Sequence, residues 1–234
     1  MKNLLIIVGL CFSFNLYCQT SDSYCNSGLY KFNAGDFQSA IADYTLAIQL
    51  DPNNKEAYIR RGNSKYNLQD YTGAIADLTK AIELDPYDRS SYVNRANSKY
   101  NLHDYVGSIS DYTKAIDIDP NNKDAYFDRG DSKSNLEDYK GAIADYTRYI
   151  ELDPNKSNAY LNRGTAMYNL EDYNGAIIDY TKAIELDPNN SNPYIKRGFS
   201  KYQMGLKDSA CLDFSKAGEL GEAKAYDLIK QYCN

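Results

Sequence analysis

The sequence predicts an all-α protein, a solenoid of six stacked helical hairpins closed by one further helix. The first observation is a period of 34 residues, since residues 21–224 align on themselves six times without an insertion or deletion. The second is that fixed positions of each block are small or aromatic, and the third is that Pro follows Asp at the end of the first five blocks. Such a period is typical of stacked repeats, in which each unit packs on its neighbours.

Residues 1–18 differ from the repeats and are predicted to be a secretory signal peptide. A basic residue near the start is followed by the apolar run 4–14, which is short for a membrane span. Cleavage is expected before Gln19, although Leu16 and Cys18 match the usual small residues poorly. A lipid-modified Cys18 and an uncleaved anchor therefore stay open as alternatives. In each case we expect export to the periplasm, the cell surface or the medium, with no membrane span after signal removal.

The mature domain, residues 19–234, is predicted to hold six repeats. At about 100° per residue, block positions 4, 8 and 12 share one side of a first helix, and positions 20, 24 and 27 share one side of a second. Small residues at positions 8, 20 and 27 would let the two backbones approach closely. The expected repeat bounds are 21–54, 55–88, 89–122, 123–156, 157–190 and 191–224.

Caps and breaks separate the helices. The turn inside each block is expected near position 15, which is Gly35 in the first block and Gly205 in the last. Asp at position 16 is suited to cap the second helix, and Pro at position 32 to end it. The expected caps are Asp36, Asp70, Asp104, Asp138 and Asp172, and the expected breaks are Pro52, Pro86, Pro120, Pro154 and Pro188.

This pattern resembles the tetratricopeptide repeat (TPR) family, whose positions 4 and 24 are aromatic, 8, 20 and 27 small, and 32 Pro. Position 4 is Tyr in all six blocks, and position 8 is Gly except for Ala96. Position 24 is Tyr or Phe except for Leu78, and the match spans residues 21–224. The resemblance implies a right-handed TPR solenoid of six helix-turn-helix repeats that binds a partner on its concave face.

A capping helix over residues 222–233 is predicted to cover the end of the stack, as terminal repeats require. It would carry Cys233 towards Cys211 in the last repeat, so we expect a disulfide between them. The alternative is two small buried thiols. Cys25 would then remain free. The predicted apolar stripe of this helix is Ala225, Leu228, Ile229 and Tyr232.

The sequence offers no group of residues for catalysis, a cofactor or a metal. Its one His, His103, falls in a turn, and it contains neither a Gly-rich phosphate loop nor a His and Cys spacing suited to zinc. We therefore expect that the protein is not an enzyme and needs no cofactor. The formal net charge of −6 argues against a nucleic-acid partner.

Two charged rows recur, with Arg at position 7 of blocks two to six and Asp at position 23 of every block. We expect these rows to form ion pairs that set the register of the stack rather than bind a ligand. The rows are Arg61, Arg95, Arg129, Arg163 and Arg197, and Asp43, Asp77, Asp111, Asp145, Asp179 and Asp213.

The inner face of the first helices is the surface left for a partner. Amides donate and accept at once, which suits them to hold an extended peptide backbone. For position 13 the alternative is that the amide bonds local backbone groups and closes the turn. The predicted contact residues are Asn63, Asn67, Asn94, Asn97, Asn101, Asp124, Asp128, Asp131, Asn135, Asn162 and Asn169.

Block four departs from the pattern. Tyr149 stands where the other blocks have Ala, so the next hairpin must shift or leave room, and we expect Met167 to pack beside it. Asp124, Asp128 and Asp131 form an acidic spot, which either receives Lys or Arg from a partner or reflects neutral drift on a solvated face. If it is a receptor, exchanging all three for Asn should weaken a basic partner and leave melting unchanged.

We therefore expect an exported scaffold that binds a protein or peptide in its concave groove, as a monomer or a weak homo-oligomer. The alternative is a structural or self-oligomerising module whose groove is occupied by another copy. A TPR receptor for chaperone tails is excluded, because position 5, where such proteins carry Lys, is apolar or Cys in every block.

Overall fold

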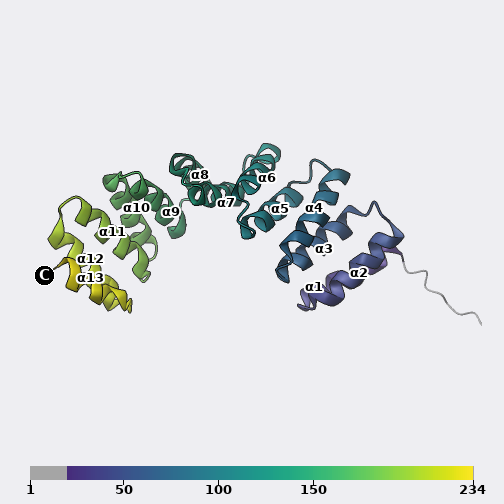
Figure 1. Cartoon of the computed structure of the whole chain (residues 1–234), viewed down its shortest axis with the longest axis horizontal. Coiled ribbons are helices and arrows are strands. Elements are labelled where there is room, and N and C mark those ends of the chain that lie inside the picture. The colour runs from purple at the N-terminus through teal and green to yellow at the C-terminus, as the bar shows by residue number, and fades with distance from the viewer. Residues whose placement is uncertain (1–19, 234) are drawn as a thin grey trace, which may run out of the picture.

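The computed structural model describes residues 20–233, so the predicted signal peptide over residues 1–18 lies outside it. Within residues 20–233 the chain forms thirteen α-helices and no strand. Six hairpins follow one another along an arc, from α1 at one end to α13 at the other (Figure 1). The all-α repeat architecture predicted from the 34-residue period is confirmed.

The first helix of each hairpin begins at the first residue of the predicted block, and the capping helix begins at Lys224, two residues later than expected. The helices are α1 Ser21–Asn33, α2 Phe37–Leu50, α3 Lys55–Asn67, α4 Tyr71–Leu84, α5 Arg89–Asn101, α6 Tyr105–Ile118, α7 Lys123–Asn135, α8 Tyr139–Leu152, α9 Ser157–Asn169, α10 Tyr173–Leu186, α11 Ser191–Gln203, α12 Lys207–Glu219 and α13 Lys224–Tyr232. Within residues 20–233, no helix is both long enough and apolar enough for a membrane crossing.

The turn between the two helices of a hairpin places block position 15 in the left-handed region. Gly35 and Gly205 have φ of 79° and 78° there. The turn closes the first helix with two backbone bonds, for example from Gln69 N to Tyr66 O at 2.8 Å and from Asp70 N to Lys65 O at 2.9 Å. The four middle hairpins adopt φ of 61° or 62° without a glycine, at Gln69, His103, Glu137 and Glu171.

The five predicted Asp caps are confirmed. In each, the carboxylate accepts from the backbone N–H three residues later, as when Asp70 accepts from Gly73 at 2.9 Å. In the sixth hairpin Leu206 takes this place and α12 has no side-chain cap. The core lies between the helices of each hairpin, where the Tyr146 ring packs so close to Gly130 that an added Cβ would meet it at 2.8 Å.

The predicted ion-pair ladder is confirmed, and it joins three helices rather than two. Arg129 Nε and Nη2 donate to the two Asp145 oxygens at 2.9 and 2.6 Å, and Nη1 donates to Thr113 Oγ1 of the preceding hairpin at 3.0 Å. The guanidinium carbon lies 5.5 Å from the centre of the Tyr126 ring. The same set of bonds recurs at Arg61, Arg95, Arg163 and Arg197.

Tyr149 packs on Phe127 of its own hairpin, with the ring centres 5.1 Å apart, and only 8% of it is exposed. Met167 packs instead with the core of the fifth hairpin around Tyr180. The expectation that Met167 compensates for Tyr149 is therefore wrong. Helical phase explains the difference, because Met167 follows the stripe that faces its own second helix.

The C-terminal helix α13 packs against α12 and closes the stack. Cys211 of α12 and Cys233 form a disulfide, with their Cα atoms 5.8 Å apart. Tyr232 adds a ring contact to Tyr202, with ring centres 4.9 Å apart. Cys25, at the other end, is a buried free thiol whose pKa is raised by burial.

Candidate functional site

The first helices of the hairpins form the inner side of the arc. Contacts join α1 to α3, α3 to α5, α7 to α9 and α9 to α11. Within residues 20–233 no second helix makes a comparable contact with the second helix of the next hairpin. The first helices are therefore the more crowded layer, as the concave side of a stack must be (Figure 1).

A groove runs along this concave side. It consists of four cavities of about 200, 320, 250 and 170 Å³, in order from the first hairpin to the sixth. The first two share Tyr66 and Asn97, the next two share Tyr100 and Asp131, and the last two share Thr165. We call these four linked cavities the groove.

Ten of the eleven predicted contact residues line the groove, and Asp124 lines a separate cavity beside it. Sequence reasoning left out Thr165 and Lys196, which also line it. Their block positions could have identified them. Lys196 stands at position 6 like Asn94, and Thr165 stands at position 9 like Asn97. The ten predicted residues are Asn63, Asn67, Asn94, Asn97, Asn101, Asp128, Asp131, Asn135, Asn162 and Asn169.

The amides at block position 13 bond the backbone of their own helix. Asn67, Asn101 and Asn135 each donate from Nδ2 to the carbonyl four residues earlier, at 2.8 Å. Two of them also lie near the hydroxyl of a Tyr from the preceding hairpin, as when Asn101 donates to Tyr66 at 3.1 Å. The local alternative is therefore the correct one for these three residues, although they also line the groove.

The floor of the groove holds consecutive hairpins together. Asp131 accepts from the Tyr146 hydroxyl at 2.6 Å and from Asn162 Nδ2 of the next hairpin at 3.0 Å. Asn94 donates to Asn63 Oδ1 of the preceding hairpin at 2.9 Å. The expectation that exchanging the three acidic residues leaves melting unchanged does not fit this arrangement, because Asp131 bonds two neighbours and Asn would replace a charged acceptor with a neutral one.

Asp128 is half-buried on the same helix, and no group within residues 20–233 donates a hydrogen bond to its carboxylate or pairs with it. Burial raises the pKa of Asp128 to about 7, and the charges of Asp131 and Asp124 add to that rise. The pKa of Asp131 is also raised by burial, although its bonds to Tyr146 and Asn162 oppose the rise. The groove thus contains an acidic floor at the fourth hairpin.

Lys196 lies at the other end of the groove, where burial lowers its pKa. No carboxylate within the described part of the chain forms an ion pair with its ammonium group. The groove is therefore polar along its length, with carboxylates at the fourth hairpin and a cation at the sixth. Between the fourth and the sixth hairpin, an extended chain lying in it would meet first carboxylates and then a cation.

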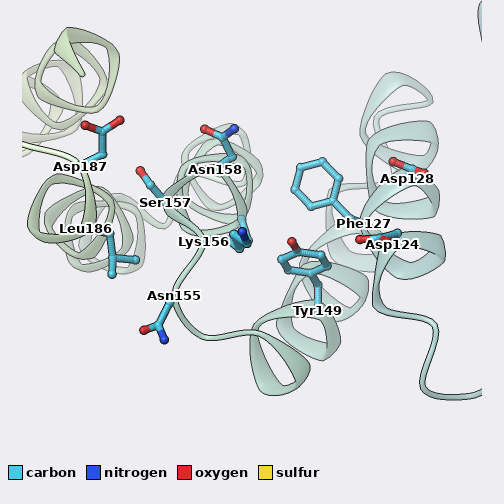
Figure 2. A pocket seen from close by; sticks show the side chains of 11 residues that line it. Asp124, Phe127, Asp128, Tyr149, Asn155, Lys156, Ser157, Asn158, Leu186 and Asp187 are labelled. Carbon is cyan, nitrogen blue, oxygen red and sulfur yellow. The ribbon is translucent and has the colours of Figure 1, made fainter. Parts of the chain in front are cut away.

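A second cavity of about 530 Å³ opens between the fourth and fifth hairpins. Phe127 and Tyr149 line one side of it, and Lys156 and Asn158 lie opposite them (Figure 2). Asp128 lines both this cavity and the groove. We call it the side cavity. Nowhere in residues 20–233 do three or more His, Cys, Asp or Glu side chains gather closely enough to hold a metal ion.

All the family models that match the chain describe the same kind of repeat. Tetratricopeptide repeats match residues 21–54, 56–88, 90–122, 111–144 and 157–190. No protein of curated function matches the sequence significantly.

Solved structures with the same fold include MamA, which is 25% identical, with a TM-score of 0.70 over 74% of this chain and 94% of that one. A tetratricopeptide repeat protein from Parabacteroides merdae is 20% identical, with a TM-score of 0.67 over 92% of this chain and 100% of that one. YrrB, described as a TPR protein with an unusual peptide-binding site, is 22% identical, with a TM-score of 0.72 over 80% of this chain and 97% of that one.

Proposed function

The chain belongs to the tetratricopeptide repeat family, and we propose that it is an exported scaffold that binds an extended segment of a partner protein in its groove. The observation that carries this proposal is the continuity of the groove. Four linked cavities cross all six hairpins on the concave side, and a lone pocket for a small molecule would not extend over so many repeats.

The chemistry of the groove supports a peptide as its occupant. Amide and hydroxyl groups line it at repeated intervals, and they can bond a peptide backbone whatever its side chains are. Tyr66 and Tyr100 add rings that a chain can pack against at little cost in entropy. YrrB, which has the same fold and is described as having an unusual peptide-binding site, is a precedent for peptide binding by this fold.

Two features support export. Residues 1–18 have the basic start and short apolar run of a secretory signal, and Cys211 and Cys233 are disulfide-bonded. Disulfides persist in secreted and periplasmic proteins and are rare in the reducing cytosol. We expect the protein purified from its source to begin at Gln19 and to keep this disulfide in a non-reducing mass spectrum. A chain that begins at Met1 with two free thiols would contradict export.

The groove is tested by selecting peptides of about twelve residues from a random library against residues 19–234. Asn101→Trp should fill the groove and lower the affinity of the selected peptides at least ten-fold. Val106 lies on α6 outside the groove and is 69% exposed, so Val106→Trp serves as the matched control and should bind normally. Equal binding by both variants would contradict the groove.

Light scattering after size exclusion tests the alternative occupant. A monomer that binds selected peptides agrees with the proposal. A dimer that dissociates only in the Asn101→Trp variant would instead assign the groove to a second copy of this chain.

A further inference from the structure

We propose that the side cavity binds the guanidinium group of an arginine side chain that projects from the segment held in the groove. This inference rests on the proposed function, because it needs a partner segment that lies beside the cavity. It names the chemistry by which the fourth and fifth hairpins would recognise that segment.

The aromatic wall of the cavity exists at this junction of hairpins and at none of the others in the described chain. Block position 27 is Tyr149 here and a fully buried Ala in the other five hairpins. Tyr149 packs on Phe127 with the ring planes inclined by 57°, and both rings line the cavity. The face of an aromatic ring attracts a cation, and guanidinium groups stack on such faces more readily than ammonium groups do.

The repeat pattern leaves a cation missing at the same place. In the second, third and fourth hairpins the first residue of the block is Lys or Arg, and it pairs with the Asp that follows the second helix, as Lys55 pairs with Asp85 at 2.7 Å. In the fifth hairpin Ser157 takes that place and donates to Ala183 O at 3.0 Å. Asp187 therefore has no ion pair within residues 20–233, and it lines the side cavity.

The first hairpin shows that a missing Lys or Arg at the start of the block is not sufficient by itself to form such a site. It also begins with a serine, Ser21, which donates to Ala47 O at 2.9 Å. Ala47, however, is the ordinary residue at position 27, so no aromatic wall stands there. Within residues 20–233, the junction between the fourth and fifth hairpins alone combines an Asp that has no ion pair with two aromatic rings.

Three carboxylates line the side cavity, and Asp128 connects it with the groove. Asp128 is half-buried and has no hydrogen-bond donor among residues 20–233, whereas Asp124 and Asp187 are exposed at the rim. A guanidinium between the rings and Asp128 would give that carboxylate the paired donors it lacks, in the bidentate geometry that arginine favours. Because Asp128 lines both spaces, a side chain can enter from a segment lying in the groove.

Lys156 lines the cavity as well and reduces the attraction for a cation. It is exposed, and it faces the rings from across the cavity (Figure 2). Removing its charge should therefore strengthen the binding of an arginine. This expectation separates a cation site from an apolar pocket, which would be indifferent to the charge of Lys156.

The test uses acetylated decapeptides of Ala, Asn and Ser that carry one arginine, and the same peptides with neutral citrulline in its place, measured by fluorescence anisotropy. The arginine peptide should bind at least ten-fold more tightly than the citrulline peptide. Asp128→Asn and Tyr149→Ala should each reduce that ratio to about one, and Lys156→Gln should increase it. Tyr149→Ala restores the residue of the other five hairpins, so it should fold.

Asp117 is a matched control, because it is an exposed Asp on α6 outside the groove, and Asp117→Asn should keep the ten-fold ratio. Equal binding of both peptides, still blocked by Asn101→Trp, would overturn the arginine site and leave the groove intact. Free arginine that binds as tightly as the peptide would overturn the peptide as its source. Failure of all peptides to bind would overturn the groove and this inference together.

Discussion

The Tyr146 hydroxyl donates a 2.6 Å hydrogen bond to Asp131, so the largest fully buried side chain of the fourth hairpin is bonded to the floor of the groove. The two residues stand at block positions 24 and 9. The third hairpin repeats this relationship between Tyr112 and Asn97. Where position 24 is Phe214 instead, position 9 is Phe199, and the two rings are 5.3 Å apart. Positions 9 and 24 are therefore matched in polarity in the third, fourth and sixth hairpins.

Tyr44 breaks this match, because position 9 of the first hairpin is Leu29 and no group among residues 20–233 forms a hydrogen bond with the buried Tyr44 hydroxyl. We predict that Tyr44→Phe leaves the free energy of unfolding unchanged or raises it by up to about 1 kcal/mol, since it removes an unsatisfied polar atom. Tyr146→Phe is the control and should cost about 1–3 kcal/mol. Urea unfolding followed by circular dichroism measures both. If Tyr44→Phe lowered the free energy of unfolding more than Tyr146→Phe does, the Tyr44 hydroxyl could not be an unsatisfied polar group.

Asp128 should make stability depend on pH. Its folded pKa of about 7 lies above its ordinary value of 3.8, so the folded state holds the proton more tightly. The free energy of unfolding is then lowered as pH rises from about 4 to 7. Asp128→Asn should stabilise the protein by about 1–2 kcal/mol at pH 8, with solvent screening allowed for, and have little effect at pH 4. Melting temperatures at both pH values test this, and an equal gain at both would refute it.

The left-handed turn residues predict stabilising glycine substitutions. Gln69 has φ of 62°. This backbone conformation is strained for a residue that has a Cβ atom, but it is not strained for glycine. Gln69→Gly should therefore raise the free energy of unfolding by about 0.5–1 kcal/mol. Gln38, which is exposed within α2, is the control, and Gln38→Gly should cost about 1 kcal/mol. A loss at both positions in thermal melts would show that the turn carries no strain.

Arg129 should matter for stability and not for partner binding. Its carboxylate partner Asp145 is buried, and Arg129→Ala would remove its bidentate donor and leave Lys133, at 2.7 Å, as its remaining ion pair within residues 20–233. We expect a loss of about 2–4 kcal/mol. Arg148 is the control, because its ion pair with Glu151 is exposed. Arg148→Ala should lower the free energy of unfolding by less than about 0.5 kcal/mol. If Arg129→Ala instead weakened selected peptides without affecting the melt, the ladder would be a binding site.

The disulfide should hold the capping helix on the stack. Its two cysteines are 22 residues apart, and closing a loop of that length stabilises the folded chain by about 3 kcal/mol. The double variant Cys211→Ser, Cys233→Ser should lose that amount, and amide hydrogen exchange should show the loss concentrated in α13. Dithiothreitol should lower the melting temperature of the parent protein and leave that of the double variant unchanged.

The hairpins, their caps and the ion-pair ladder could be predicted because each depends on residues that repeat at fixed spacing. Asp70 caps α4 through a bond that spans three residues. Arg129 reaches Asp145 because 16 residues carry the chain through one turn of fixed length. Such contacts recur with the period, so six copies of one pattern reveal them without coordinates.

The contacts between repeats could not be predicted in the same way. Asn67 lines the groove as expected, and its amide also bonds its own helix, but the repeat pattern alone does not show which of the two open alternatives holds. Asp131 was grouped with Asp124 and Asp128 by spacing alone. The structure separates Asp131 from Asp128, because Asp131 accepts from Tyr146 and Asn162 whereas Asp128 has no donor among residues 20–233.

The sequence by itself determined the all-α repeat fold, because helical phase, caps and breaks are set within about 34 residues of chain. The tertiary structure alone decided that four cavities join into one groove and that a side cavity opens beside Tyr149 and Phe127. The physical reason is that packing between hairpins depends on the shapes and charges of side chains from neighbouring repeats. The effect of a residue that departs from the repeat pattern can be seen only when the residues of the neighbouring hairpins are in place around it.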